Sequence, residues 1–343
     1  MRILLMSGHR YPADNGKSSD PRPFPSGAPF VVHDLIAKGL ARLGHDVYYL
    51  LENGAELPPP DGIKVTREII NDVDIFHNCE RVDGPWVKTQ HRFADELGGA
   101  TPPENWIFAS RSLARSHGKE RFVTNGVDPE GFTYGETKQD YFLFLAGMQG
   151  PRNRHAYWGK GLDIALSLSK SMGFELVVAG TAIDREIINK VSEMCREAGA
   201  RYLGDVRSAR KAELLAGARG LLFPTRLNEG CPLVIAEALM SGTPIIASDK
   251  GPCKELVTTD VGFVCAEQQD YTRAIENIDR ISPRACREKA LDSFHYMRMA
   301  ANYIIEYEKE LGTCGTAEAV KGLVNRDVCR DLALSSSPAP ENK

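Results

Sequence analysis

Two glutamates in the second half of the chain have the type and spacing to bind a ligand rich in hydroxyl groups. Glu229 and Glu237 are eight residues apart in a segment that runs from Leu221 to Pro244. If that segment ran on in helical register, the carboxylates would lie about 12 Å apart along the axis, and one ligand could be held at two places. The hydroxyls of a sugar or ribose would be suitable donors. Taken alone, such carboxylates are more often solvated, so the surrounding sequence must decide.

The surrounding residues predict a buried strand, a polar loop and a helix. The strand ends at Pro224, Pro232 stands at the start of the helix, where a missing N–H is tolerated, and Gly242 ends the helix. Free backbone N–H groups at the start of the helix would then point at the mouth of the sheet. This segment is therefore a candidate anion site beside two carboxylates.

A glycine-rich basic loop, Gly147–Gly161, precedes the first predicted helix of the second half. It carries Arg152, Arg154 and Lys160, which together with a helix N-terminus can bind phosphate groups. From composition alone, a solvated connection is an equally good interpretation.

Two histidines lie at the carboxyl ends of predicted strands in the first half of the chain. His77 is the last residue of the strand Ile75–His77, and His91 follows the strand Trp86–Thr89. The carboxyl end of a strand is where a functional histidine is expected, although a lone histidine is more often structural. Both interpretations stay open at this point.

The elements that must position these residues alternate between strands and helices. Strands are predicted at Arg2–Ser7, Asp46–Leu51, Ile75–His77, Trp86–Thr89, Trp106–Ala109, Arg121–Thr124, Tyr141–Leu145, Glu175–Ala179, Arg201–Leu203, Gly220–Pro224 and Pro244–Ser248, and helices at Phe30–Leu43, Gly161–Met172, Ala182–Glu197, Lys211–Ala216, Pro232–Met240 and Pro283–Leu311. The polar stretch Tyr134–Asp140 is a predicted linker. The pattern predicts two doubly wound α/β domains facing across a cleft, with the long connection Gly8–Pro29 as a ligand-facing loop.

Composition excludes several classes of protein. The chain has 343 residues with 42 Lys+Arg and 46 Asp+Glu, so its formal charge of −4 argues against a nucleic-acid partner. Its 8 cysteines form no C-x-x-C pair, which predicts free thiols and neither a zinc site nor a disulfide framework. No stretch is long and apolar enough for a transmembrane segment, so we expect a cytoplasmic protein, with peripheral membrane association left open.

At this point the residues resemble a known family. Ser26-Gly27-Ala28-Pro29, Gly44-His45-Asp46-Val47, Asn125-Gly126-Val127-Asp128, Lys160-Gly161-Leu162-Asp163 and the Glu229…Glu237 segment ending in Pro244 are together similar to glycosyltransferase family 4. The resemblance runs from Met1 to about Leu311. It implies the GT-B fold, with an N-terminal Rossmann-like domain at 1–135 on the acceptor side, a donor domain at 136–290 and a helix at 291–311 crossing back. Beyond that helix the pattern is lost, which predicts a mobile or disordered tail at 312–343.

The resemblance also implies roles for individual residues. Catalytic roles fall to Glu229, which contacts the donor sugar, Lys160, which holds the diphosphate, and His91, near the transferring sugar. Donor-binding positions are Gly27, Arg152, Arg154, Val206, Gly230, Leu233 and Glu237, the last on the ribose. On the acceptor side we expect Trp86 and Arg92 to line the cleft.

The reaction implied is transfer of a hexosyl group from a nucleotide-diphosphate sugar to a hydroxyl acceptor, with retention of configuration and without metal or cofactor. Neither the nucleotide, the hexose nor the acceptor, whether saccharide, small molecule or lipid-linked glycan, follows from the sequence. One departure is that Met148 stands where the family usually has an arginine, which Arg152 or Arg154 could replace. The alternatives are a nucleotide-sugar epimerase of the same fold and a catalytically silent nucleotide-sugar binder.

Overall fold

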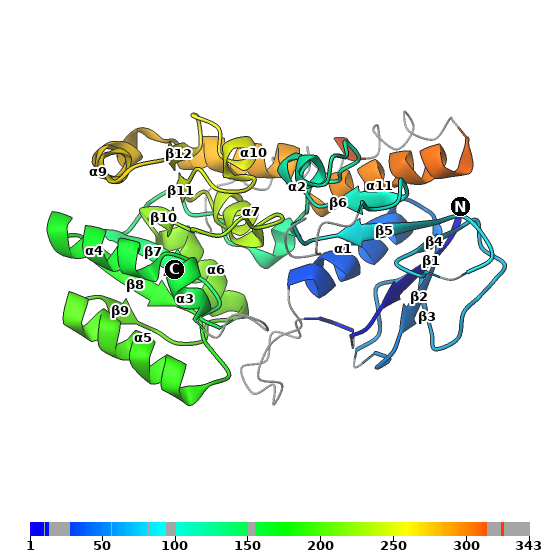
Figure 1. Ribbon diagram of the computed structural model, residues 1–343, viewed down its shortest axis with the longest axis horizontal. Coiled ribbons are helices and arrows are strands. Elements are labelled where there is room, and N and C mark those ends of the chain that lie inside the picture. Colours follow the sequence, from blue (N-terminus) through cyan, green and yellow to red (C-terminus); the bar gives the residue numbers. More distant parts are fainter. Residues whose placement is uncertain are drawn as a thin grey trace, which may run out of the picture.

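The chain folds into two α/β domains that lie side by side, each built on a six-stranded parallel sheet (Figure 1). The computed structural model describes residues 1–9, 11–13, 28–55, 57–80, 82–93, 101–149, 155–313 and 324–325. No helix in these ranges combines the length and apolar character needed to span a bilayer. The predicted α/β architecture of two doubly wound domains is confirmed.

The two sheets have the same strand order. The first contains β1 (Arg2–Ser7), β2 (Asp46–Leu51), β3 (Ile63–Thr66), β4 (Ile75–His77), β5 (Trp86–Gln90) and β6 (Trp106–Phe108), and the second contains β7 (Tyr141–Leu145), β8 (Glu175–Ala179), β9 (Arg201–Tyr202), β10 (Gly220–Phe223), β11 (Ile245–Ser248) and β12 (Gly262–Cys265). The orders are β3-β2-β1-β4-β5-β6 and β12-β11-β10-β7-β8-β9. Ligands bind such sheets where the order reverses, beyond the carboxyl ends of β1 and β4 or of β7 and β10.

Helices connect the strands and cover the sheets. They are α1 (Ala28–Arg42), α2 (Arg111–Ser116), α3 (Ala156–Gly159), α4 (Leu162–Met172), α5 (Arg185–Ala198), α6 (Ser208–Gly217), α7 (Leu233–Met240), α8 (Cys253–Leu256), α9 (Gln268–Asn277), α10 (Pro283–Ser293) and α11 (Tyr296–Leu311), with short 3-10 turns η2 (Pro129–Gly131) and η3 (Ile278–Arg280). In Figure 1, α10 lies over the second domain and α11 over the first.

Two predicted elements differ from the structure, and others were not predicted. Arg121–Thr124 is not a strand, because the edge strand β6 is short and only Phe108 forms a bridge, to Phe122. The strands β3 and β12 and the helices α2, α3, α8 and α9 have no counterpart in the sequence prediction. The single helix expected over 283–311 is two helices, because His295 caps α11 by accepting a hydrogen bond from the amide of Met297 at 3.1 Å.

Helix α11 joins the C-terminal end of the second domain to the first. It packs on α1 at Gly39, where a Cβ would lie 2.5 Å from the Cβ of Ala300. Farther along, the buried Tyr303 and Tyr307 reach into the first domain, and their hydroxyls contact Thr89 at 2.8 Å and His77 at 2.6 Å. A continuous apolar core therefore runs from the first sheet through α11 to the second sheet.

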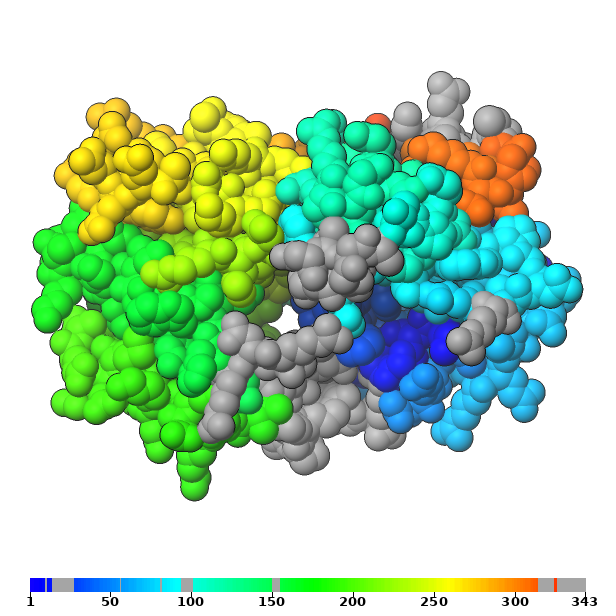
Figure 2. Space-filling model, in the orientation of Figure 1, coloured from blue at the N-terminus to red at the C-terminus, as the bar shows by residue number. Residues whose placement is uncertain are grey.

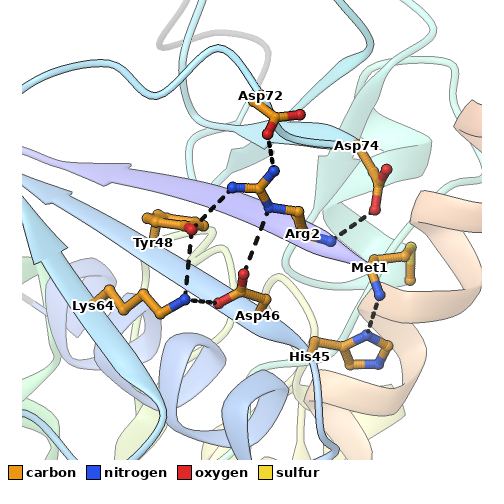
Figure 3. Close-up of polar contacts among 8 residues, drawn as sticks. All are labelled: Met1, Arg2, His45, Asp46, Tyr48, Lys64, Asp72 and Asp74. Carbon is orange, nitrogen blue, oxygen red and sulfur yellow. Dashed lines mark hydrogen bonds and ion pairs between the residues drawn. The ribbon is translucent and has the colours of Figure 1, made fainter.

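The amino ends of the first sheet carry a network of polar side chains (Figure 3). The guanidinium of Arg2 contacts Asp46, Asp72 and the hydroxyl of Tyr48, and Lys64 pairs with Asp46 at 2.6 Å. These groups are largely exposed, so each pair contributes little to the free energy of folding. They mark the edge of the sheet opposite to the carboxyl ends.

The cysteines of the described ranges are free thiols, as the sequence predicted. Cys79, Cys195, Cys253, Cys265 and Cys286 are buried and Cys231 is half-buried. Cys314 and Cys329 lie outside the described residues.

Candidate active site

The candidate site lies where the carboxyl ends of the two sheets face each other. Figure 2 shows a hollow between the green residues of the second domain and the blue residues of the first. The loop after β10 contacts the loop after β5: a Cβ built on Gly230 would lie 2.4 Å from the carbonyl oxygen of His91. The loop Glu229–Cys231, here called the donor loop, thus touches both domains.

Lys160 and Glu229 form an ion pair at this place. The Nζ of Lys160 donates to Oε2 of Glu229 at 2.6 Å, and both side chains are largely buried. The other carboxylate oxygen, Oε1, is buried and accepts no hydrogen bond within the described part of the chain. Since a buried polar atom without a partner is unfavourable, Oε1 is an acceptor available to a ligand.

Backbone packing fixes Lys160 beside the donor loop. Gly161 has a φ of +79°, and a Cβ there would lie 2.0 Å from the carbonyl oxygen of Pro224, so only glycine permits this close approach. Arg226 completes the contact, because its amide donates to Gly159 at 2.8 Å and its guanidinium binds both oxygens of Asp163 at 2.7 Å. The ends of β10 and of the loop before α4 are therefore held together.

The donor loop and the start of α7 present free amides. Pro232 is the N-cap of α7 and provides no side-chain cap. Within the described ranges, the amides of Gly230, Cys231 and Leu233 donate to no other group. The loop itself is not helical, so the helical-register estimate for the spacing of the two glutamates does not apply. A helix start of this kind favours an anion.

Glu237 has a partner that the sequence did not reveal. The Nζ of Lys211, on α6, donates to Oε1 of Glu237 at 2.8 Å and lies 5.7 Å from the centre of the Phe132 ring. Twenty-six residues separate the two partners, so no local spacing could have indicated the pair. Both predicted carboxylates are thus paired with a lysine.

The two histidines singled out in the sequence differ in their environments. His77 is completely buried and both ring nitrogens are bonded, Nδ1 to Tyr307 at 2.6 Å and Nε2 to Thr89 at 2.7 Å, which is a structural arrangement. His91 has a buried Nε2 with no partner among the described residues. Burial lowers the pKa of His77 to about 3 and that of His91 to about 4, so both rings are neutral near pH 7.

A further polar chain lies beside His91 and was missed in the sequence. The amide of Thr89 donates to Oδ1 of Asn78 at 2.8 Å, which directs the Nδ2 of Asn78 to Nε2 of His33 at 3.0 Å. His33 then contacts Ser7 at 3.3 Å, and His9 joins Ser7 to Asp34 through bonds of 2.8 Å each. The His33 and His91 rings are 5.8 Å apart. This series of hydrogen bonds rigidifies the carboxyl edge of the first sheet.

Several expected site residues lie elsewhere or outside the described ranges. Trp86, expected on the acceptor side of the cleft, stands at the amino end of β5, at the opposite end of that strand from His91, so it does not line the cleft. Arg92 is exposed at the carboxyl end and Val206 is half-buried in the loop after β9. Gly27, Arg152, Arg154 and most of the loop 8–29 fall outside the described residues.

Met148 has a clear structural role. Its side chain is completely buried in the apolar core of the second domain, and its amide donates to the carbonyl of Thr181 at 2.9 Å. An arginine in that orientation would place a charge in the core. The described residues also hold no group of three or more His, Cys, Asp or Glu placed to bind a metal ion.

Sequence comparison relates the second domain to a family of known chemistry. Residues 140–281 match the family model of glycosyl transferases group 1. The O-antigen chain mannosyltransferase RfbU of Salmonella typhimurium strain LT2 is 22% identical over 166 residues, an alignment that covers 46% of this chain and 44% of that protein. The match therefore spans less than half of the relative's length.

Solved structures resemble nearly the whole chain. AviGT4, a glycosyltransferase involved in avilamycin A biosynthesis, has a TM-score of 0.69 at 22% identity over 91% of this chain and 98% of that one. Sucrose-phosphate synthase from Thermosynechococcus elongatus (TM-score 0.64, 14% identity, 90% and 98% covered) and Anabaena HepE in complex with UDP-glucose (0.64, 14%, 90% and 100%) are similar. The chain thus has the GT-B fold of these structures, and its residues 140–281 are similar to the glycosyl transferases group 1 family.

Proposed function

We propose that this chain is a retaining glycosyltransferase of family 4, which moves a hexosyl group from a nucleotide-diphosphate sugar to a hydroxyl acceptor without a metal or cofactor. The observation that carries the proposal is the Lys160–Glu229 pair beside the uncapped start of α7. A cation, free amides and a buried carboxylate oxygen at one point match the parts of such a donor: a diphosphate and a sugar with hydroxyl groups. The match to glycosyl transferases group 1 supports the same chemistry.

Each group has a part in the proposed reaction. Lys160 and the amides of Gly230 and Leu233 stabilise the negative charge that develops on the leaving diphosphate. Glu229 accepts hydrogen bonds from sugar hydroxyls through Oε1, and binding of the donor replaces its bond to Lys160. Glu237 accepts from the ribose, with Lys211 holding its carboxylate. Neutral His91 lies near the transferring sugar. The acceptor hydroxyl attacks the anomeric carbon from the face that the diphosphate leaves, the bond from that carbon to the diphosphate breaks, and the hydroxyl proton passes to the departing phosphate oxygen.

A nucleotide screen tests the donor site. The wild-type protein is heated with UDP, GDP, ADP or dTDP and their common sugars, because a ligand at 100 times its Kd should stabilise by about 2.7 kcal/mol. Lys160→Met should abolish the shift. Lys64→Met is the matched control: it removes a lysine from an ion pair of the same 2.6 Å length at the opposite edge of the first sheet. Equal shifts in wild type and Lys160→Met would remove Lys160 from the site.

Product analysis tests the reaction itself. With the selected donor and a panel of hydroxyl acceptors, NMR of the anomeric proton should show retained configuration, and EDTA should leave the rate unchanged. Inversion, or a rate that EDTA abolishes and Mg²⁺ restores, would contradict the proposal. Epimerisation of the donor without an acceptor, or binding without turnover, would point to the alternative functions.

A further inference from the structure

The carbonyl groups of the donor loop are held by side chains of the first domain. The hydroxyl of Ser110 donates to the carbonyl oxygen of Gly230 at 2.5 Å, and the Nδ2 of Asn125 donates to that of Cys231 at 3.3 Å. Ser110 is completely buried and Asn125 is 3% exposed, so water does not compete for these bonds. Two consecutive residues directly after Glu229 are therefore fixed from the other domain.

Ser110 uses both of its hydrogen-bonding capacities. It is the N-cap of α2, and its Oγ accepts from the amide of Leu113 at 3.1 Å. A hydroxyl has a single proton, and here that proton goes to Gly230. The position of the donor loop is thus tied to the start of a helix in the first domain.

Fixing this carbonyl also directs an amide. In a trans peptide, the C=O of Gly230 and the N–H of Cys231 point in opposite directions. Because Ser110 holds the carbonyl on the side of the first domain, the Cys231 amide faces away from that contact, and it donates to no other described group. The backbone of Gly230 already lies against the carbonyl group of His91, with no room even for a Cβ between them. The loop therefore cannot shift toward the first domain.

A second contact joins the same helix to the second domain. The carboxylate of Glu255, on α8, accepts from the amides of Arg111 and Ser112 at 3.1 and 3.2 Å. The start of α2 therefore makes hydrogen bonds to both the donor loop and α8. Together these bonds specify one docked arrangement of α2 against the second domain.

We infer that Ser110 and Asn125 are positioning residues for the donor site: the first domain sets the conformation of Glu229–Cys231, so full donor affinity requires α2 to be docked. The inference rests on the proposed function, since it concerns the same donor loop. Neither side chain needs to touch the donor. Their effect is to hold the free amides and the Glu229 carboxylate in one geometry.

The test separates loop positioning from helix capping. Ser110→Asp retains an oxygen that accepts from Leu113 but, when ionised, has no proton for Gly230, whereas Ser110→Thr retains both functions. Asn125→Leu removes the second bond at similar volume. The control Ser282→Ala removes an N-cap serine from α10, where the amide of Ala285 donates to Oγ at 3.4 Å.

The readouts are the Kd for the nucleoside diphosphate that stabilises wild type in the screen above, and the donor KM and kcat. Ser110→Asp and Asn125→Leu should raise Kd and donor KM about 3- to 10-fold, the range expected for one hydrogen bond, with kcat changed less. Ser110→Thr and Ser282→Ala should match wild type. Far-UV circular dichroism checks folding, and Asn125→Leu decides the matter if the Ser110 variants do not fold.

The outcomes distinguish this inference from the proposed function. Suppose that wild type binds a nucleotide, that Lys160→Met does not bind it, and that Ser110→Asp and Asn125→Leu bind it as wild type does. Only the positioning role is then overturned. An equal loss of nucleotide affinity in Ser282→Ala would assign the effect to helix capping and would also overturn the positioning role. If wild type binds none of the four nucleotides, both proposals fail.

Discussion

At the scale of single residues, the candidate site depends on contacts that only one residue type permits. Gly161 is the clearest case, because its left-handed backbone and the 2.0 Å approach to Pro224 both exclude a Cβ. That contact places Lys160 beside Glu229. The Lys160 cation, which we propose stabilises the leaving diphosphate, is therefore positioned by a glycine that itself does no chemistry.

We predict that Gly161→Ala lowers both stability and nucleotide binding. The added methyl group combines left-handed strain with a backbone clash, so the free energy of unfolding should fall by about 2–4 kcal/mol. Gly173→Ala is the matched control, since Gly173 has a φ of +75° at the end of the same helix with nothing within 4 Å. Its cost should be about 1 kcal/mol, with nucleotide affinity unchanged. Urea denaturation and nucleotide titration measure both, and equal losses would contradict the steric argument.

The buried His33 and His77 and the half-buried His91 predict a pH dependence of stability. Burial lowers the pKa values of His33, His77 and His91 below the ordinary 6.5, to about 4 for His91 and about 3 for His77. The unfolded state therefore binds more protons than the folded state below pH 6.5. Stability should be fully present above pH 6.5 and fall as the pH drops toward 4, by up to about 1.4 kcal/mol per pH unit for each histidine.

Denaturation at pH 7.5 and pH 5.5 measures this slope. His91→Gln removes one titrating group. It should reduce the slope of the unfolding free energy against pH by about the contribution of one histidine. His155, whose side chain is exposed, is the control position. A slope that His91→Gln leaves unchanged would show that the pKa of His91 is not lowered in the folded state.

At the scale of elements, α11 decides how the two domains are joined. Arg121 of the first domain donates from Nε to Glu306 at 2.8 Å and from Nη1 to Glu310 at 3.0 Å, both on α11. Glu306 is 6% exposed and is also paired with Lys309 at 2.6 Å. The helix is thus fixed by a largely buried ion cluster in addition to Tyr303 and Tyr307.

We predict that Arg121→Met lowers the free energy of unfolding by about 2–3 kcal/mol. The loss is less than the full cost of an unpaired buried carboxylate because Lys309 remains. The double variant Arg121→Met/Glu306→Leu should regain part of this stability, because the buried Glu306 carboxylate that lost its Arg121 partner is then removed as well. Chemical denaturation of the three proteins tests this, and a double variant less stable than the single one would refute the explanation.

At the scale of the whole molecule, the two domains share one core. Apolar residues of both sheets and of α11 belong to a single buried cluster. The donor loop, α2 and α8 add polar contacts across the domain boundary. A GT-B protein built in this way should unfold as one cooperative unit, although it contains two sheets.

The three tryptophans allow a direct test of that expectation. Trp86 and Trp106 belong to the first domain and Trp158 to the second. Trp158→Phe leaves fluorescence from the first domain, and Trp86→Phe/Trp106→Phe leaves that from the second. Each protein should show the same midpoint by fluorescence and by circular dichroism. Fluorescence and circular dichroism midpoints that differ within one variant would show independent domains.

The sequence by itself determined the alternation of strands and helices, the donor segment Glu229…Glu237 and the glycine, Gly242, that ends its helix. These are local properties, set by hydrophobic periodicity and backbone preference over a few residues. It did not reveal that Arg121–Thr124 is not a strand, because the neighbouring edge strand β6 is too short to pair with it. Nor did it reveal that the helix over 283–311 breaks at His295.

Tertiary structure alone decided which side chains meet. It paired Lys160 with Glu229 and Lys211 with Glu237, buried His77 and Met148, and placed Trp86 at the amino end of its strand. Ser110 and Asn125 reach the donor loop across more than a hundred residues of chain. The physical reason is that such contacts follow from the packing of distant elements, whose geometry no short sequence pattern contains.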